Sequence, residues 1–158
     1  MDDLDTKALA LLCENGRISW AELAQHLQLS APAAAERVRK LEERGIIRGY
    51  TALLDAASFG YGLVAFVAVT LGKCKHRKAF LRAIKKLPEV LECHRMTGED
   101  DYLLKLLVRD TAHLDTLVTD SLRTIDGVQR TKTSVVLSTI KETAFGQFHR
   151  VPAATSTE

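Results

Sequence analysis

The chain has 158 residues, 46% of them hydrophobic, which is enough for a core in one ordinary domain or two small ones, and its net charge of +2 is too weak to indicate nucleic-acid binding by itself. No apolar run approaches the roughly 20 residues that cross a bilayer, and the acidic first residues lack the layout of a signal peptide, so we expect a soluble, cytoplasmic protein without membrane contact. The three cysteines, Cys13, Cys74 and Cys93, are odd in number and scattered, which argues against a disulfide framework or a zinc site and predicts reduced, mostly buried thiols.

Two helices are predicted before residue 30. Asp2 and Asp3 can cap a first helix whose apolar residues recur at helical spacing to about residue 14, where an Asn-Gly pair stops it. Ser19 and Glu22 match a capping box, in which the hydroxyl and the carboxylate each satisfy a free backbone amide of the first turn. A short second helix therefore begins there and ends at a tight turn at Gln28-Leu29.

A third helix follows at once. Ser30 is a suitable N-cap, and Pro32 lies in the first turn, where its missing N–H costs nothing. The apolar residues of this helix are spaced four and three apart and form its core face: Ala34, Val38 and Leu41. Gly45 ends the helix, and the β-forming residues over 46–54 predict the strand or short hairpin of a wing.

Two short helices joined by a tight turn, the second of them basic, form the helix-turn-helix unit that lays its second helix in the major groove of double-stranded DNA. Residues expected nearest to base edges are Ser30, Ala31, Ala33, Ala34, Glu36 and Arg37. Residues better placed for phosphates are Arg39, Lys40, Arg44 and Arg48. Because alanine cannot hydrogen-bond, we expect sequence reading to depend on Arg37, Glu36, the helix N-terminus and DNA shape. The alternatives are a helical subdomain with a solvated basic face, and a winged helix that binds protein.

The second half of the chain predicts a different architecture. A glycine-containing hinge over 55–62 separates it from the DNA-binding domain, 1–54. Strands are predicted over 63–71, 90–96, 102–108 and 128–137, the last ending near residue 140, and helices over 80–87 and 112–122. The order βαββαβ makes the whole protein α+β, with a ferredoxin-like sandwich over 63–142 and a C-terminal tail over 143–158. Helices on one face leave the other sheet face uncovered, which favours a homodimer.

Several motifs of both halves resemble the Lrp/AsnC family of leucine-responsive, feast/famine regulators. In the first half these are Gly16-Arg17-Ile18-Ser19, Glu22-Leu23-Ala24, Leu29-Ser30, Arg37-Val38, Leu41-Glu42 and Gly45-Ile46-Ile47. In the second half they are Pro88-Glu89-Val90, the run from Thr97 to Leu104, and the run from Gly127 to Thr133. The similarity covers residues 3 to 142 in the right order. The alanines at the start of the third helix depart from the family's usual Ser, Thr or Cys, so an operator preference does not transfer.

The resemblance implies dimers that assemble into tetramers or octamers, no cofactor, and a small effector, commonly an amino acid, bound between dimers. The effector residues it implies are Thr97, Gly98, Glu99, Asp100, Asp101 and Tyr102, with hydroxyl contacts from Thr131, Thr133 and Ser134. A glycine in this loop lets backbone approach a ligand, and the Asp101 carboxylate can hold an α-ammonium group while backbone amides hold the ligand's carboxylate. The alternative is a solvated turn between two strands.

Three alternatives to a regulator are considered: an enzyme, a metal-binding protein and an architectural DNA-binding protein. Siroheme decarboxylases resemble the same two-domain family and bind a tetrapyrrole through His and Arg, for which His76, His94, Arg95 and His113 are candidates. A metal site at Cys74 to His76 and Cys93-His94 is disfavoured, because neighbouring residues on a strand point to opposite faces. No nucleophile–base pair or metal-ligand set is visible, so we expect no enzyme activity. The third alternative is an architectural protein that binds DNA through phosphate contacts without an effector.

Overall fold

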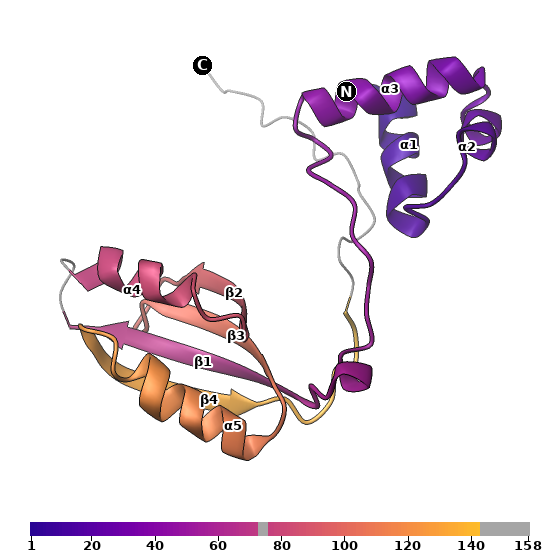
Figure 1. The fold of residues 1–158 in the computed structure, drawn as a ribbon. Helices are drawn as coiled ribbons and strands as arrows, with labels where there is room; N and C mark the ends of the chain where they lie inside the picture. Colours follow the sequence, from indigo (N-terminus) through magenta and orange to yellow (C-terminus); the bar gives the residue numbers. More distant parts are fainter. Residues whose placement is uncertain (73–75, 143–158) are drawn as a thin grey trace, which may run out of the picture. The chain divides into compact units, whose positions relative to one another are not determined.

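The structure is a computed structural model that describes residues 1–72 and 76–142. The chain forms two compact units, with residues 1–53 in the N-terminal unit and residues 54–140 in the C-terminal unit (Figure 1). Cys74 and the tail predicted over 143–158 lie outside the described residues. No helix in the described ranges is long and apolar enough to cross a membrane.

The N-terminal unit consists of three helices, α1 (Asp3–Glu14), α2 (Trp20–Leu27) and α3 (Ala31–Glu43) (Figure 1). The predicted capping box begins α2, because Glu22 N–H donates to the Ser19 hydroxyl at 3.2 Å and Ser19 N–H donates to the Glu22 carboxylate at 3.0 Å. A second box, which the sequence prediction missed, begins α1 with reciprocal bonds between Asp2 and Asp5. The three predicted helices are therefore confirmed.

Small and branched apolar side chains form the core of this unit. The buried residues come from all three helices and carry the predicted core face of α3: Ala8, Leu23, Ala24, Leu27, Ala34, Val38 and Leu41. Gln28, with φ of 56°, makes the tight turn between α2 and α3. Ala34 is fully buried, so it is not available to a base edge, and the prediction that it contacts DNA is wrong. Its spacing from Val38 and Leu41 places Ala34 on the face of α3 that packs against the core.

The wing predicted over 46–54 is wrong, because this stretch contains no strand. After α3 the backbone N–H groups of Ile46 and Ile47 both donate to the carbonyl of Leu41, so the chain first winds back on the helix end. The one sheet of the described residues has four strands, all from the C-terminal unit. Residues with a high β propensity form a strand only where a second strand pairs with them, and no described residue of the chain pairs in this way with 46–54.

The C-terminal unit has the predicted βαββαβ order. Its elements are the 3-10 helix η1 (Ala56–Phe59), β1 (Leu63–Leu71), α4 (Arg77–Ile84), β2 (Val90–Arg95), β3 (Tyr102–Val108), α5 (Thr111–Thr116), the π-helical turn η3 (Leu117–Leu122) and β4 (Val128–Val135). The predicted hinge therefore contains a helical turn, which Asp55 caps by accepting hydrogen bonds from two backbone N–H groups. The last strand is shorter than predicted and ends at Val135.

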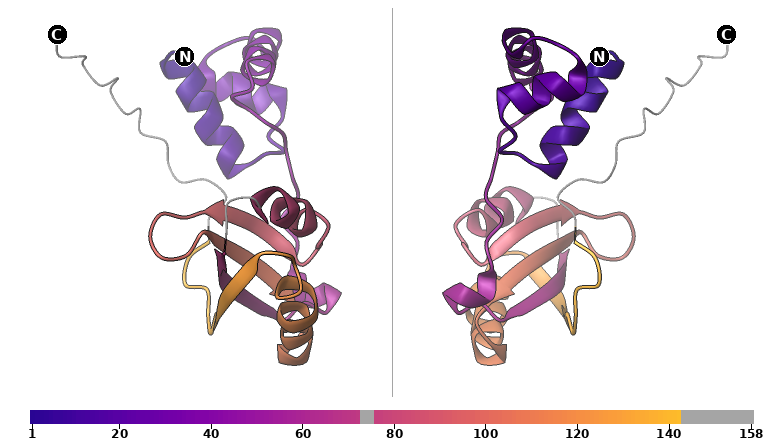
Figure 2. Two further views of the ribbon diagram at one scale, coloured as in Figure 1. Left: turned by 90° about the vertical axis from the view of Figure 1, so that its left-hand side faces the viewer. Right: turned by 90° about the vertical axis from the view of Figure 1, so that its right-hand side faces the viewer.

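The four strands form an antiparallel sheet in the order β2-β3-β1-β4, with α4 and α5 on the same side (Figure 2). Side chains alternate between the two faces, so the helix-covered face of β1 and β3 is fully buried: Ala65, Val67, Val69, Leu104, Leu106 and Val108. Both helices contribute to this core, with Phe80 and Ile84 from α4, Leu114 from α5, and Leu117 and Leu122 from η3. Fold and topology agree with the predicted ferredoxin-like sandwich.

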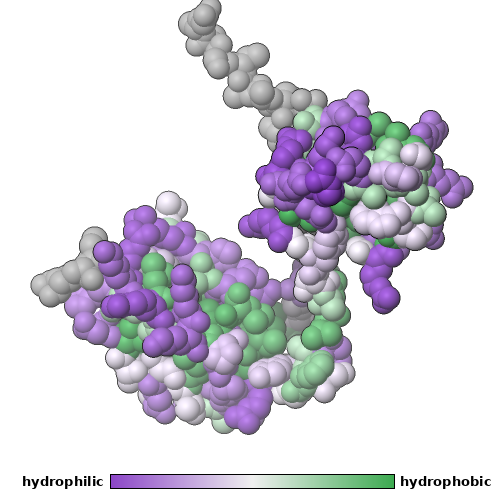
Figure 3. Space-filling model, turned by 45° about the horizontal axis from the view of Figure 1, so that its top comes forward, coloured by the Kyte–Doolittle hydropathy of each residue, from purple (hydrophilic) through white to green (hydrophobic). Residues whose placement is uncertain are grey.

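The opposite sheet face, called here the open face, also carries apolar side chains. Its half-buried members come from the two central strands: Val64, Phe66, Ala68, Leu103 and Leu107. Elsewhere, hydrophobic side chains reach the surface of the C-terminal unit as patches bounded by hydrophilic ones (Figure 3).

Cys13 and Cys93 are exposed, so the prediction of mostly buried thiols is wrong for both. They lie on an outward position of α1 and on the edge strand β2.

Candidate DNA-binding helix and effector loop

One face of α3 points away from the core and forms the candidate DNA-binding surface. Its exposed members lie opposite the buried ones at helical spacing: Pro32, Ala33, Glu36, Arg39, Lys40 and Glu43. The hydroxyl of Ser30 accepts a hydrogen bond from Ala33 N–H at 3.4 Å, so this predicted contact residue also caps the helix. Ala31, at the first helical position, is half-buried.

Arg37 is bound to the start of α1. Its Nη1 donates to both carboxylate oxygens of Asp2 at 2.7 Å and to Asp5 Oδ1 at 2.5 Å, and its side chain is only 26% exposed. The hydrogen bond from Arg37, with that from the backbone of Asp5, holds the pKa of Asp2 below its usual range. Burial works against the charge of Asp5, but hydrogen bonds from the Asp2 backbone and Arg37 lower its pKa overall. Arg37 thus links two helices, a contact that sequence reasoning missed.

The remaining cations of this surface differ in their partners. Arg39 binds Glu36 and Glu43, and Lys40 lies 3.7 Å from Glu36. Among the residues that the structure describes, Arg44 and Arg48 have no carboxylate partner. Beside α3 lies a cavity of about 300 Å³, lined by Asp5, Ala33, Glu36, Arg37, Lys40, Leu41 and Arg44. Three of these residues are basic, which gives the surface the cations that phosphate binding requires.

The predicted effector loop connects β2 to β3 and is tied to the end of β1. The carboxylate of Asp101 accepts a hydrogen bond from Leu71 N–H at 2.7 Å, and its backbone N–H donates to the carbonyl of Val69 at 2.9 Å. The Asp100 carboxylate accepts from the Thr70 hydroxyl at 2.9 Å and from Arg130 at 3.3 Å. These bonds tie the loop to the end of β1 and to Arg130 of β4.

Other parts of the loop are less constrained. Glu99 is exposed and lies 4.0 Å from Arg130, and Thr97 is exposed at the start of the loop. Gly98 has φ of 110°, a left-handed conformation that side chains rarely adopt. Tyr102 faces the core instead of solvent: it is 4% exposed and its ring lies 4.9 Å from that of Phe80, between centroids. Its hydroxyl is buried without a hydrogen-bond partner.

The three predicted hydroxyl residues of β4 do not share a face of the sheet. Thr131 pairs with Val69 and Thr133 with Val67, so both belong to the helix-covered face, whereas Ser134 pairs with Phe66 on the open face. Side chains of a strand alternate between its two faces, so residues three apart, such as Thr131 and Ser134, lie on opposite faces. This separation could have been predicted from the sequence.

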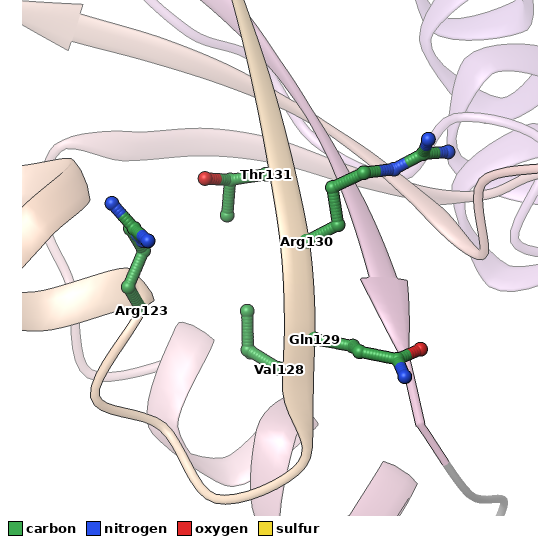
Figure 4. Close-up of a pocket in the computed structure, with 5 residues that line it drawn as sticks. All are labelled: Arg123, Val128, Gln129, Arg130 and Thr131. Atoms are coloured by element: carbon green, nitrogen blue, oxygen red, sulfur yellow. The ribbon is translucent and has the colours of Figure 1, made fainter.

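Thr131 lines a cavity of about 300 Å³ at the start of β4, together with Arg123, Val128, Gln129 and Arg130. Figure 4 shows Arg123, Val128 and Thr131 on one side of the strand and Gln129 and Arg130 on the other. Sequence reasoning did not single out Arg123, which lines this cavity, or Thr70, which bonds to Asp100 of the loop. It quoted Arg130 only within a family motif, and only the fold shows that Arg130 reaches the loop.

The described residues contain no group of three or more His, Cys, Asp and Glu side chains that could hold a metal ion. Three histidines already have acidic partners. His94 lies 2.7 Å from Glu92, His76 lies 2.9 Å from Asp126 and His113 lies 3.6 Å from Glu89.

A helix-turn-helix unit with an exposed polar helix, followed by a ferredoxin-like unit with a structured loop at one sheet end, is the architecture of a two-part DNA-binding regulator. The AsnC-type helix-turn-helix domain matches residues 1–42, and the Lrp/AsnC ligand binding domain matches residues 64–144. The chain belongs to the Lrp/AsnC family of transcriptional regulators.

Individual relatives match nearly the whole chain. The leucine-responsive regulatory protein of Rhizobium meliloti is 39% identical over 147 residues, 90% of this chain and 92% of the relative. A transcriptional regulator of Neisseria meningitidis, solved as a complex with L-methionine, has a TM-score of 0.88 and 39% identity over 91% of this chain and 94% of that one. The feast or famine regulatory protein of Mycobacterium tuberculosis, also complexed with L-methionine, has a TM-score of 0.85 and 32% identity. The match covers 92% of this chain and 98% of that protein.

Proposed function

We propose that this regulator reads operator DNA with α3, pairs with a second copy through the open face of its sheet, and responds to an amino acid at the β2–β3 loop. The observation that carries the proposal is the exposed face of α3, which presents charged side chains at helical spacing on a rigid, capped helix. We assign DNA binding to residues 1–54 and assembly and effector binding to residues 63–142. We propose that the protein works in the cytoplasm, together with the DNA that it binds.

The DNA contacts divide into two groups. Ser30, Ala31, Ala33 and Glu36 line the face that meets base edges, with Ala33 available to a thymine methyl group. Lys40, Arg44 and Arg48 are exposed cations suited to phosphates. Gel shifts at several salt concentrations, with the DNA upstream of its own gene and with random DNA, test this. We expect tighter binding to the upstream DNA and an affinity that falls with salt for both. Equal affinity for both would support the architectural alternative instead.

The proposed dimer covers the open face. Five half-buried apolar side chains of β1 and β3 lie there, and a two-fold partner would remove them from water. A dimer also supplies two recognition helices for two half-sites about one helical turn apart. Further assembly to a tetramer or octamer follows the family pattern, and light scattering of the purified protein measures it.

The proposed effector is an amino acid, because two related structures contain L-methionine. Oδ2 of Asp101 accepts a hydrogen bond from Leu71 N–H, which leaves Oδ1 to accept from a ligand's ammonium group. A thermal-shift panel of the twenty amino acids identifies the ligand, since binding to the folded state raises the melting temperature. Asp101→Ala should abolish the shift and leave DNA affinity intact. Loss of DNA binding in that variant would contradict the assignment of the loop.

We propose no enzymatic role. The candidate tetrapyrrole ligands His94, His76 and His113 lie 2.7, 2.9 and 3.6 Å from carboxylates, and they come from different parts of the C-terminal unit. An absorbance spectrum recorded after addition of siroheme tests this. A shifted Soret band would favour the decarboxylase-like alternative.

A further inference from the structure

Arg39 differs from the other cations of α3 in how its guanidinium is held. Its Nε and Nη2 donate to the two carboxylate oxygens of Glu36 at 2.8 and 2.6 Å, and its Nη1 donates to Glu43. Both carboxylates lie on α3 itself, one turn before and one turn after Arg39. The side chain is still 54% exposed, so the guanidinium is fixed in place on the outer face of the helix.

These bonds leave a defined set of donors. A guanidinium carries five N–H groups, one on Nε and two on each Nη. Glu36 takes one from Nε and one from Nη2, and Glu43 takes one from Nη1. One N–H therefore remains on Nη1 and one on Nη2. A bidentate contact with O6 and N7 of guanine requires two parallel N–H groups, and the edge between Nη1 and Nη2 supplies them when Glu43 accepts from the other Nη1 hydrogen.

The position of Arg39 on the helix suits a base edge. Glu36, Arg39, Lys40 and Glu43 are exposed and follow the i, i+3, i+4, i+7 spacing of one helix face, opposite the buried Val38. Arg37, which the sequence favoured for base reading, is half as exposed as Arg39 and has its charge balanced by carboxylates at the start of α1. A recognition helix reads bases with the side chains of its outer face.

The same carboxylates argue against the phosphate contact that the sequence predicted for Arg39. A phosphate approaching Arg39 would meet the negative charges of Glu36 and Glu43 on both sides. A base edge carries no net charge, so it meets little of this repulsion. Holding the guanidinium in place before binding also reduces the side-chain entropy that recognition would cost.

We propose that Arg39 is the principal base-reading residue of α3, that it selects guanine, and that Glu36 and Glu43 are its positioning residues. The inference rests on the proposed function, in which α3 enters the major groove. It predicts a guanine at a fixed position of each operator half-site.

The test is binding-site selection from random duplexes with the full-length chain and two variants. The wild-type chain should select sites with a fixed guanine in each half-site. Arg39→Ala should lose the preference at that base alone, by about 10-fold or more when the guanine is replaced. Lys40→Ala, a matched control one residue away, should weaken binding to all sequences, reduce the salt dependence by about one phosphate contact and keep the guanine preference.

The positioning role has its own readout. Glu43→Gln should reduce the guanine preference while leaving the unfolding of the N-terminal unit, followed by Trp20 fluorescence, unchanged. An unchanged preference in Glu43→Gln overturns the positioning role. If Arg39→Ala weakens binding to all sequences equally and lowers the salt dependence, Arg39 is a phosphate contact and the inference is wrong, while the proposed function stands. A wild-type chain that selects no sequence overturns the proposed function itself.

Discussion

Arg37 and Asp5 join segments that lie far apart in the sequence. Asp5 accepts hydrogen bonds from the Asp2 backbone and from Arg37, and its side chain is 10% exposed. One carboxylate therefore completes the cap of α1 and also fixes α3 against it. The capping boxes are local patterns, and the one at Ser19 was predicted from the sequence. The Arg37 contact spans 32 residues, so no local pattern indicates it.

Asp5→Ala should lower the free energy of unfolding of the N-terminal unit by about 2 kcal/mol, because it removes a capping partner and leaves a half-buried Arg37 with one carboxylate fewer. Urea unfolding followed by the fluorescence of Trp20, the only tryptophan, measures this. Asp3→Ala is the matched control, since Asp3 is exposed in the same first turn. A loss in the control equal to that in Asp5→Ala would show that helix-dipole effects, not the Arg37 contact, are responsible.

The same pair has a pH signature. The folded-state pKa of Asp5 is lower than its ordinary 3.8, so its contribution to stability is fully present above that value and is lost as pH falls through the lowered folded-state pKa. Wild-type unfolding by urea should therefore become easier below about pH 4, and this dependence should be weaker in Asp5→Ala.

Tyr102→Phe should leave the C-terminal unit as stable as before, or more stable by up to about 1 kcal/mol, because it removes a buried hydroxyl that has no hydrogen-bond partner. Calorimetric melting measures the change. The variant should also keep its response to the amino-acid effector, since the ring packs in the core against Phe80. A lost response with unchanged stability would place the hydroxyl at the ligand and contradict this expectation.

At the scale of elements, the periodic helices and the sheet of the C-terminal unit were predictable, and the wing was not. The helices α1 to α3 and the positions of the four strands along the chain follow from apolar spacing, caps and glycines, all of which are local. The wing failed because β propensity over 46–54 says nothing about a partner strand. The hydroxyl residues expected at the effector differ in another way: Ser134 and Thr131 were grouped by residue type, although the strand period puts them on opposite faces.

The turn before β4 depends on Gly127. This residue has φ of 90°, and a Cβ there would lie 2.2 Å from Cβ of His76. Gly127→Ala should therefore lower the free energy of unfolding of the C-terminal unit by about 2–5 kcal/mol, because it strains the backbone and clashes with His76. Gly98→Ala is the control, since it has a φ of 110° but no atom within 4 Å of the added Cβ, and should cost about 1 kcal/mol. Equal losses would mean that strain alone matters and that His76 moves away freely.

At the scale of the whole molecule, the two proposed activities depend on the same assembly. A single α3 reads one half-site, whereas a dimer reads two, and the second contact then occurs at a high effective concentration. An effector bound at the end of the sheet can change DNA binding only if it prefers one arrangement of the subunits over another. If the open face joins two subunits as proposed, it contributes to affinity for DNA, although none of its residues is proposed to touch DNA.

Phe66→Asp places a charge at the centre of the open face and tests this dependence. If that face is the dimer interface, burial of a carboxylate among the apolar side chains of β1 and β3 should disfavour association, and light scattering should report monomers at concentrations where the wild-type chain is a dimer or larger. Affinity for a two-site operator should fall by about 100-fold, whereas binding to a single half-site should hardly change. Ala112→Asp, which adds the same charge to the exposed surface of α5, should leave both measurements as they are. A Phe66→Asp protein that still dimerises would show that another surface joins the subunits, and the affinity of that dimer for DNA would then have to be explained without the sheet.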